Sequence, residues 1–153
     1  MIEPKDRSTA VVVIPALNEE RAIRAVVRDA LAQCGKVIVV DDGSSDGTGA
    51  AIADLPVECI RHDAPQGKAS ALQDGFRRAL ELGCAGVLTM DGDGQHAAVD
   101  LPRLLTAAQK YPGRIVIGAR LQGRDAAPGK NRFGNRQADF FVSWAAGARI
   151  VDS

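Results

Sequence analysis

The sequence predicts an α/β domain, in which a mostly parallel sheet carries helices on both faces. Short runs of β-branched residues alternate along the chain with longer segments whose apolar residues have helical spacing. The short runs are almost continuously apolar, which is typical of parallel strands buried on both faces. Polar loops with several carboxylates follow three of these runs. Alternating strands and helices of this kind favour right-handed crossovers and one functional edge of the sheet.

Length and composition are those of one globular domain, expected to span residues 1–153. Apolar residues make up 46% of the chain and charged residues 25%, which argues against disorder. Lys plus Arg and Asp plus Glu number 19 each, so net charge gives no support for a nucleic-acid partner. No apolar stretch is long enough to span a bilayer, and the first residues lack the apolar core of a signal peptide. We therefore expect a cytoplasmic protein, while its oligomeric state stays open.

The first strand is expected over residues 11–14, where Pro15 should end it. Asn18 is a candidate N-cap for a helix that runs to about residue 33, before Gly35. Its inward face would hold five apolar residues, which are Ile23, Val26, Val27, Ala30 and Leu31.

The second strand is expected over residues 37–40, and a loop rich in turn-forming and capping residues, 41–48, then opens onto a helix. Residues 57–61 form a weaker third strand. A helix over residues 67–82 should turn its larger apolar side chains inward, namely Leu72, Phe76, Ala79 and Leu80.

A fourth strand is expected over residues 87–90, a helix over 98–110 and a fifth strand over 115–117. Residues 122–136 are polar and without periodicity, as in a flexible loop, and residues 137–148 regain helical spacing. The chain then stops at Ser153 without a capping signal, so we expect a protein truncated at its C-terminus.

The carboxylates gather where strands end. Glu19 follows the first strand, Asp41 and Asp42 the second, and Asp91 and Asp93 the fourth. Because the carboxyl ends of parallel strands meet at one edge of a sheet, these three loops are predicted to form one site.

The run Asp91-Gly92-Asp93 is the candidate metal site. Side chains two residues apart in extended backbone point the same way, so both carboxylates are able to face one cation. Oxygen ligands of this kind suit Mg²⁺ or Mn²⁺, which share their other positions with water and substrate phosphates. The structural alternative is an ordinary Asp-Gly turn.

Other polar residues have both a functional and a structural interpretation. Asp42 at a strand tip would accept a hydrogen bond from a nucleobase or ribose, although this loop also has helix-capping residues. Lys68 and Arg120 would contact phosphate, although the sequence around Lys68 is not a Walker A loop, and the structural alternative for Arg120 is a solvated surface arginine. His96 is either a group beside the metal or a structural residue.

Four segments resemble the inverting family 2 glycosyltransferases of GT-A fold, and among these the dolichol-phosphate (polyprenyl-phosphate) mannose synthase-like enzymes. They are Val-Val-Ile-Pro-Ala-Leu-Asn-Glu-Glu (12–20), Val-Asp-Asp-Gly-Ser-Ser-Asp-Gly-Thr (40–48), Met-Asp-Gly-Asp-Gly-Gln-His (90–96) and Ile-Gly-Ala-Arg (117–120). The resemblance is collinear from about residue 10 to the end. It implies a Rossmann-like nucleotide-diphospho-sugar transferase fold.

The resemblance also implies roles for individual residues. Pro15, Leu17 and Glu19 would line the nucleotide pocket, and Val40 and Asp42 would hold base and ribose. Asp91 and Asp93, the catalytic pair, would bind the metal and diphosphate with Gly92 between them and Gln95 nearby, and Arg120 would touch the donor phosphates. The family often has Gly-Lys-Gly where this chain has Gly67-Lys68-Ala69, so the chain departs from the family pattern beside Lys68. The Ser-Gly-Phe-Arg segment that usually follows an Asp-Ser like Asp152-Ser153 is absent.

These observations predict a metal-dependent hexosyltransferase that moves a sugar, with inversion, from GDP-mannose or a UDP-sugar. A polyprenyl or dolichyl phosphate at the cytoplasmic membrane face is the expected acceptor, since its ionised oxygen needs little help from a base. A sugar-phosphate nucleotidyltransferase is an alternative, but it would have a basic Gly-rich loop after the first strand. A nucleotide-sugar-binding fragment without activity is another. A dinucleotide-binding oxidoreductase is disfavoured because no G-x-G-x-x-G follows the first strand.

Overall fold

The computed structural model describes residues 10–95, 98–111 and 115–116. The chain divides into two compact units, residues 1–106 and 107–153, and the fold and site below belong to the first. Its elements, in chain order, are β1 (Ala10–Ala16), α1 (Ile23–Cys34), β2 (Val37–Asp41), α2 (Thr48–Ala51), β3 (Glu58–Arg61), α3 (Lys68–Glu81), β4 (Gly86–Thr89) and the 3₁₀ turn η2 (Ala98–Asp100). The helix α4 (Leu101–Lys110) begins in this unit.

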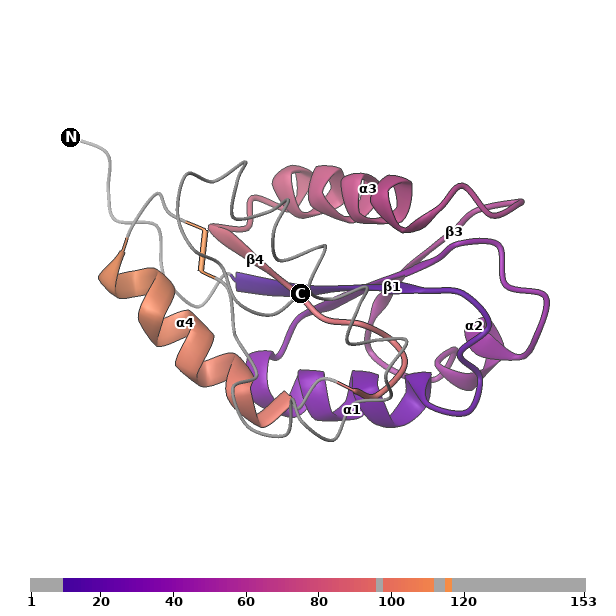
Figure 1. Ribbon diagram of the computed structural model, residues 1–153, viewed down its shortest axis with the longest axis horizontal. Coiled ribbons are helices and arrows are strands. Elements are labelled where there is room, and N and C mark those ends of the chain that lie inside the picture. Colours follow the sequence, from indigo (N-terminus) through magenta and orange to yellow (C-terminus); the bar gives the residue numbers. More distant parts are fainter. Residues whose placement is uncertain (1–9, 96–97, 112–114, 117–153) are drawn as a thin grey trace, which may run out of the picture. The chain divides into compact units, whose positions relative to one another are not determined.

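The four described strands form one parallel sheet in the order β3-β2-β1-β4 (Figure 1). Val13 of β1 aligns with Ile38 of β2 on one side and with Thr89 of β4 on the other. The predicted parallel α/β arrangement is therefore confirmed, with strand positions that agree to within a few residues.

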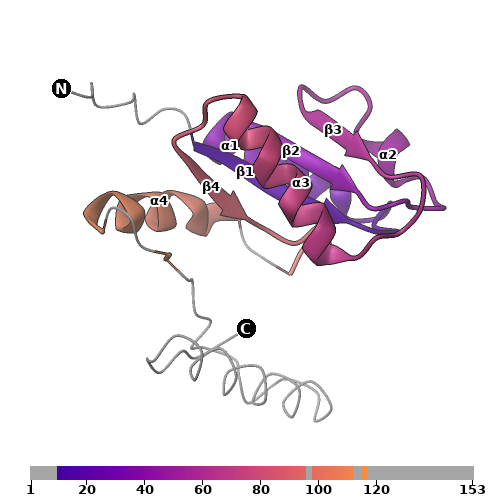
Figure 2. The ribbon, with the colours of Figure 1, turned by 90° about the horizontal axis from the view of Figure 1, so that it is seen from above.

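Each face of the sheet has its own apolar core, because neighbouring residues of a strand point to opposite faces. On one face, α1 packs against a cluster that includes Val12, Ile14 and Val39. On the other face, α3 packs against a second cluster that includes Val11 and Val13. Figures 1 and 2 show α1 and α3 on opposite sides of the strands. The continuous apolar runs of β1 and β2 are thus explained by burial on both faces.

The seat of α3 on the sheet depends on a glycine. A Cβ added at Gly75 would clash with the side chain of Val13, and its next neighbour would be Val40 at 3.3 Å. The buried residues of α3 are all small, namely Ala71, Gly75 and Ala79. This small-residue face lets the helix approach the strands closely, so the prediction that Phe76 and Leu80 point inward is wrong. Their exposed fractions are 38% and 75%.

The end of β1 and the start of α1 also differ from the sequence prediction. Pro15 lies within β1 and aligns with Val40. The missing N–H of Pro15 costs no hydrogen bond of the sheet. In β1 the even-numbered residues donate towards β2, so an N–H at position 15 would point towards β4, and the pairing with β4 ends at Val13. Asn18 has a left-handed φ of 57° and does not cap α1, which begins at Ile23 after a turn closed on the Glu19 carbonyl.

The remaining predictions concern the C-terminal part of the chain. Residues 115 and 116 are described and belong to no strand, so a strand that includes them is not confirmed, and residue 117 lies outside the described residues. The predicted loop 122–136 and helix 137–148 also lie outside them, and the single-domain organisation stays a prediction. Within the described part of the chain, no helix has the length and apolar character needed to cross a membrane.

Candidate functional site

The strand order creates a crevice at one edge of the sheet. From β1 the chain moves outwards to β2 and β3, then returns to place β4 on the other side of β1. The chain therefore reverses its direction across the sheet between β1 and β4, and the helix that follows β1 (α1) and the helix that precedes β4 (α3) pack on opposite faces. In open parallel sheets, ligands bind outside the carboxyl ends of the strands at such a switch point.

A pocket of about 250 Å³ lies at this crevice. Its wall is formed by Pro15, Ala16, Leu17, Glu19, Asp42, Gly67, Lys68, Ala71, Asp91, Gly92 and Asp93. Most of the site residues expected from the sequence are among them, and they come from four segments: the end of β1 with its loop, the loop after β2, the start of α3 and the loop after β4. The prediction that the loops after β1, β2 and β4 meet at one sheet edge is confirmed by the geometry, while the roles of the residues are a separate question.

One end of the pocket is acidic. Glu19, Asp91 and Asp93 line it together, and the Nζ of Lys68 lies 2.6 Å from Oδ1 of Asp91. Burial raises the pKa of Glu19, and the negative charges of Asp93, Asp46 and Asp91 raise it further. These carboxylates repel one another, so a cation at this end of the pocket would be stabilised.

Gly92 fixes the position of the acidic loop. A Cβ at Gly92 would lie 3.3 Å from Ile23 Cδ1 and 3.4 Å from the Pro15 carbonyl oxygen. The loop therefore packs against the end of β1, which sets Asp91 and Asp93 on either side of a buried residue. The backbone N–H of Gln95 donates to Oδ1 of Asp93 over 2.9 Å, while the Gln95 residue itself is exposed.

The donor set of the acidic end fits a hard divalent ion that is shared with a substrate. Among the described residues, no three His, Cys, Asp or Glu side chains are arranged around a common metal position. Magnesium in phosphate sites is usually held by only one or two carboxylates, together with water and substrate phosphate oxygens. Asp91 and Asp93, beside the Glu19 carboxylate, therefore suit a metal that needs a diphosphate to complete its coordination.

The other end of the pocket is built around Asp42, which is only 3% exposed. Its Oδ1 accepts from the ring Nδ1 of His62 at 2.7 Å and from the Gln66 N–H at 2.8 Å. Its Oδ2 accepts from the Gly67 N–H at 2.8 Å. Burial raises the pKa of Asp42, but the Gln66, His62 and Gly67 hydrogen bonds outweigh it and lower the pKa below its usual value.

His62 contacts the pocket residue Asp42, and sequence reasoning did not single it out. It is buried, and its second ring nitrogen, Nε2, lies 3.0 Å from Oδ2 of Asp74 on α3. Hydrogen bonding to Asp42 raises the pKa of His62 against the opposing effect of burial, and Asp74 raises it further. The sequence did contain one indication of its place in the site, because His62 directly follows β3 and therefore lies at the carboxyl edge of the sheet.

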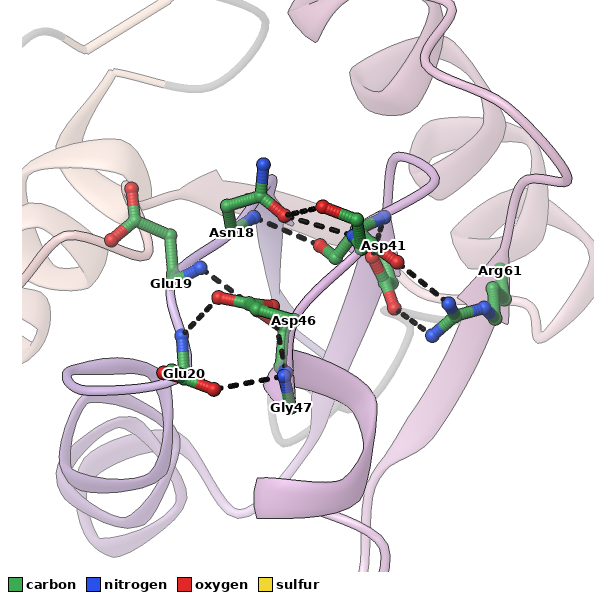
Figure 3. Close-up of polar contacts among 10 residues, drawn as sticks. Asn18, Glu19, Glu20, Asp41, Asp46, Gly47 and Arg61 are labelled. Atoms are coloured by element: carbon green, nitrogen blue, oxygen red, sulfur yellow. Dashed lines mark hydrogen bonds and ion pairs between the residues drawn. The ribbon is translucent and has the colours of Figure 1, made fainter.

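A hydrogen-bonded clamp joins the loop after β1 to the loop after β2 (Figure 3). Asn18 donates its N–H to Ser44 Oγ and accepts, through Oδ1, from the Ser45 N–H, each over 2.9 Å. Glu20 accepts from the Gly47 N–H over 2.9 Å and donates its own N–H to Asp46 over 3.2 Å. Figure 3 shows the Glu19 carboxylate pointing away from this clamp, so it is available to the pocket.

Asp41 has a structural environment, in contrast to Asp42. It is fully buried, accepts from the Ser44 N–H over 2.9 Å and pairs with Arg61 over 2.6 Å. Arg61 also donates to the Ser44 carbonyl oxygen (Figure 3). Of the two adjacent carboxylates at the end of β2, only Asp42 lines the pocket.

Three other sequence-predicted residues have different placements. The Val40 side chain is fully buried in the core beneath α3 and does not line the pocket. Arg120 and His96 lie outside the described residues.

Comparison with known proteins gives a consistent result. Residues 11–143 match the model of the family described as "Glycosyl transferase family 2". An undecaprenyl-phosphate mannosyltransferase from Micrococcus luteus is 34% identical over 141 residues, covering 87% of this chain and 55% of the relative. A UDP-N-acetylglucosamine–dolichyl-phosphate N-acetylglucosaminyltransferase from Methanococcus voltae is 28% identical over 162 residues, covering 92% of this chain and 64% of the relative.

Among solved structures, glucosyl-3-phosphoglycerate synthase from Mycobacterium tuberculosis, in complex with Mn²⁺, UDP and glucosyl-3-phosphoglycerate, superposes with a TM-score of 0.58 and 25% identity. The match covers 76% of this chain and 45% of that one. It confirms the Rossmann-like GT-A fold. The chain spans roughly half to two-thirds of the length of the two named relatives.

Proposed function

This chain belongs to glycosyl transferase family 2, and from that premise we propose that its pocket binds a nucleoside diphosphate sugar for transfer to a lipid-linked phosphate, with inversion at the sugar. The observation that carries the proposal is the chemical division of one pocket. A buried, hydrogen-bonded carboxylate lies at one end and a crowded acidic cluster at the other. A nucleoside diphosphate has the matching division, with a base and ribose at one end and phosphates at the other.

At the acidic end, Asp91 and Asp93 would hold Mg²⁺ or Mn²⁺, with Gln95 beside them. The bound metal would stabilise the negative charge that develops on the departing diphosphate. Lys68, which already reaches Asp91, would contact the same phosphates, and the family resemblance assigns Arg120 a similar role. The Mn²⁺ and UDP named for the solved M. tuberculosis enzyme support this assignment, while either metal suits the ligands.

At the other end, Asp42 would accept a hydrogen bond from the base or ribose. Pro15 and Leu17 would provide an apolar wall, since both line the pocket and Leu17 is 43% exposed. Uridine nucleotides are named for the solved enzyme and for the M. voltae relative. A UDP-sugar is therefore the proposed donor class, and GDP-mannose is the competing one.

The acceptor follows from the relatives, whose names specify undecaprenyl phosphate and dolichyl phosphate. A phosphate monoester oxygen is already ionised near neutral pH and needs no general base from the protein. We propose an acceptor of this class and a peripheral position at the cytoplasmic membrane face. Because the chain spans only part of these relatives, the second candidate is a donor-binding unit that lacks transfer activity.

Titration calorimetry tests the donor site. UDP-glucose and GDP-mannose are each titrated, with and without Mn²⁺, into the wild-type chain, into Asp93→Ala and into Asp100→Ala. We expect Mn²⁺-dependent binding that Asp93→Ala weakens by at least about 100-fold, since the loss of outer-shell partners alone costs ~10- to 100-fold. Asp100→Ala is the matched control, because that exposed carboxylate lies on η2 outside the pocket.

Failure of a folded wild-type chain to bind either nucleotide sugar would contradict the donor site. Binding that needs no metal and survives Asp93→Ala would contradict the metal assignment alone. A transfer assay with undecaprenyl phosphate separates the enzyme from the binding unit, because only the enzyme releases the nucleoside diphosphate.

A further inference from the structure

The Asp42 carboxylate belongs to a hydrogen-bonded chain, Asp42–His62–Asp74, that the proposed function does not use. His62 lies between Asp42 and Asp74, with Nδ1 2.7 Å from one carboxylate and Nε2 3.0 Å from the other. A neutral imidazole has a single N–H, so it would leave one carboxylate facing a ring lone pair. The positively charged ring donates to both carboxylates, and Arg77 balances the outer one at 2.6 Å.

The hydrogen bonds to Asp42 limit the number of acceptor positions that its carboxylate has available for a ligand. A carboxylate has about four acceptor positions, two on each oxygen. His62 and Gln66 occupy both positions on Oδ1, and Gly67 occupies one on Oδ2. Among the contacts of the described residues, one acceptor position of Asp42 remains, on an oxygen of a buried residue that lines the pocket.

The backbone holds this arrangement in place. Gly43 has a φ of 74°, and a Cβ there would lie 2.6 Å from the carbonyl carbon of Ala64 and 2.7 Å from the nitrogen of Pro65. The segment after β3 therefore lies directly on the Gly43 backbone. This contact brings His62 and Gln66, at the two ends of that segment, onto the same oxygen of Asp42.

We propose that His62 is a positioning residue that sets the base specificity of the donor pocket: by occupying Asp42 Oδ1 with Gln66, it leaves one acceptor position, which suits the single imide N–H of uracil. This inference rests on the proposed function and gives a structural cause for its choice of uridine nucleotides over guanosine nucleotides.

Guanine is the informative competitor. Its pairing edge carries N1–H and the N2 amino group side by side, so a carboxylate with both oxygens open accepts from both. Here one of these donors would meet an oxygen whose positions are already filled by His62 and Gln66. A buried donor left without an acceptor is costly, and sites discriminate strongly on this basis.

Two amide substitutions separate the two sides of the His62 ring. The amide nitrogen of Asn is as many bonds from Cβ as Nδ1 of His, and that of Gln matches Nε2. His62→Asn therefore keeps a donor for Asp42 and loses the contact with Asp74. His62→Gln keeps the contact with Asp74 and frees one acceptor position on Oδ1 of Asp42, while the Gln66 N–H keeps the other.

The experiment measures UDP and GDP affinities in Mn²⁺ by calorimetry, well below the melting temperature of each variant. For the wild type we expect UDP to bind at least about tenfold more tightly than GDP, the effect of one unpaired buried donor. His62→Asn should keep that ratio within about threefold, whereas His62→Gln should weaken UDP about tenfold and bring the ratio close to one. Asp63→Asn, an exposed position in the same segment, is the control.

A purely structural role for His62 would lower both affinities together and leave the UDP-to-GDP ratio unchanged, which would overturn the inference. A wild-type chain that binds GDP as tightly as UDP would also overturn it, even where a His62 variant does not fold. In both of these cases the donor site itself stands. A folded wild-type chain that binds neither nucleotide overturns the proposed function and this inference with it.

Discussion

The carboxylates at the two ends of the pocket differ in burial, in hydrogen bonding and in the direction of their pKa shifts. Asp42 is buried and receives three hydrogen bonds from the protein, which lower its pKa. Asp93 is exposed, and it shares its end of the pocket with Glu19, whose pKa is raised. The protein itself compensates the negative charge at one end, and it concentrates negative charge at the other.

The difference shows which part of a ligand each end is prepared for. A carboxylate that is already satisfied holds its orientation before the ligand arrives, so it is suited to reading a neutral, directional group such as a base. A cluster of repelling carboxylates gains most from a multivalent cation. The same residue type thus serves recognition at one end and charge neutralisation at the other.

The largest predicted effect is at the Asp42 end. Asp42→Asn places an amide N–H₂ where the carboxylate accepts from His62, Gln66 or Gly67, so two donors would face each other. We expect the free energy of unfolding to fall by about 2–3 kcal/mol, the usual loss for a buried charge-assisted hydrogen bond. Urea denaturation measures this change, with Asp63→Asn as the exposed control. An equal loss in Asp42→Asn and Asp63→Asn would mean that the hydrogen bonds to Asp42 add no stability beyond that of an exposed carboxylate.

A smaller effect should depend on pH. Because Asp42 and Asp74 raise the pKa of His62 above its ordinary 6.5, the stabilising contribution of the charged ring is fully present below pH 6.5. It is lost as the pH rises through the higher folded-state pKa. The wild-type chain should therefore lose its melting-temperature advantage over His62→Gln progressively as the pH rises above 6.5. An advantage that stays constant across this range would contradict a charged ring.

The smallest effect is expected at the acidic end, with the opposite sign. Without divalent metal, Asp93→Asn removes a repelling charge, so the free energy of unfolding should rise by no more than about 0.5 kcal/mol. The pKa of Glu19 should fall towards its usual range, which carbon-13 titration of the side-chain carboxyl group measures. A destabilised Asp93→Asn chain would mean that Asp93 has a structural role like that of Asp42.

The sequence predicted the sheet and the meeting of its acidic loops, because both depend on local signals. Continuous β-branched runs indicate strands buried on both faces, and parallel strands place their carboxyl ends together. The start of α1 was harder to predict from the sequence. Asn18 looks like a cap, but it adopts a left-handed conformation and binds Ser45 instead.

Contacts between distant residues could not be predicted. His62 lies 20 residues from Asp42 and 12 from Asp74, and no local pattern indicates that one ring will reach both. The inward face of α3 was missed for a related reason. Large apolar residues usually mark the buried face of a helix, but here the close approach to β1 requires small ones, and Phe76 and Leu80 are left outside.

Gly75, on the sheet-facing side of α3, has a consequence for the width of the pocket. Lys68 and Ala71, at the start of that helix, form part of the pocket wall, and Gly75 lies about 10 Å along the axis from Lys68 at 1.5 Å per residue. A tilt of about 5° at this pivot would displace the helix start by roughly 1 Å. The volume of a core side chain such as Val13, which is buried and does not line the pocket, therefore influences how far the start of α3 lies from the Asp91 loop.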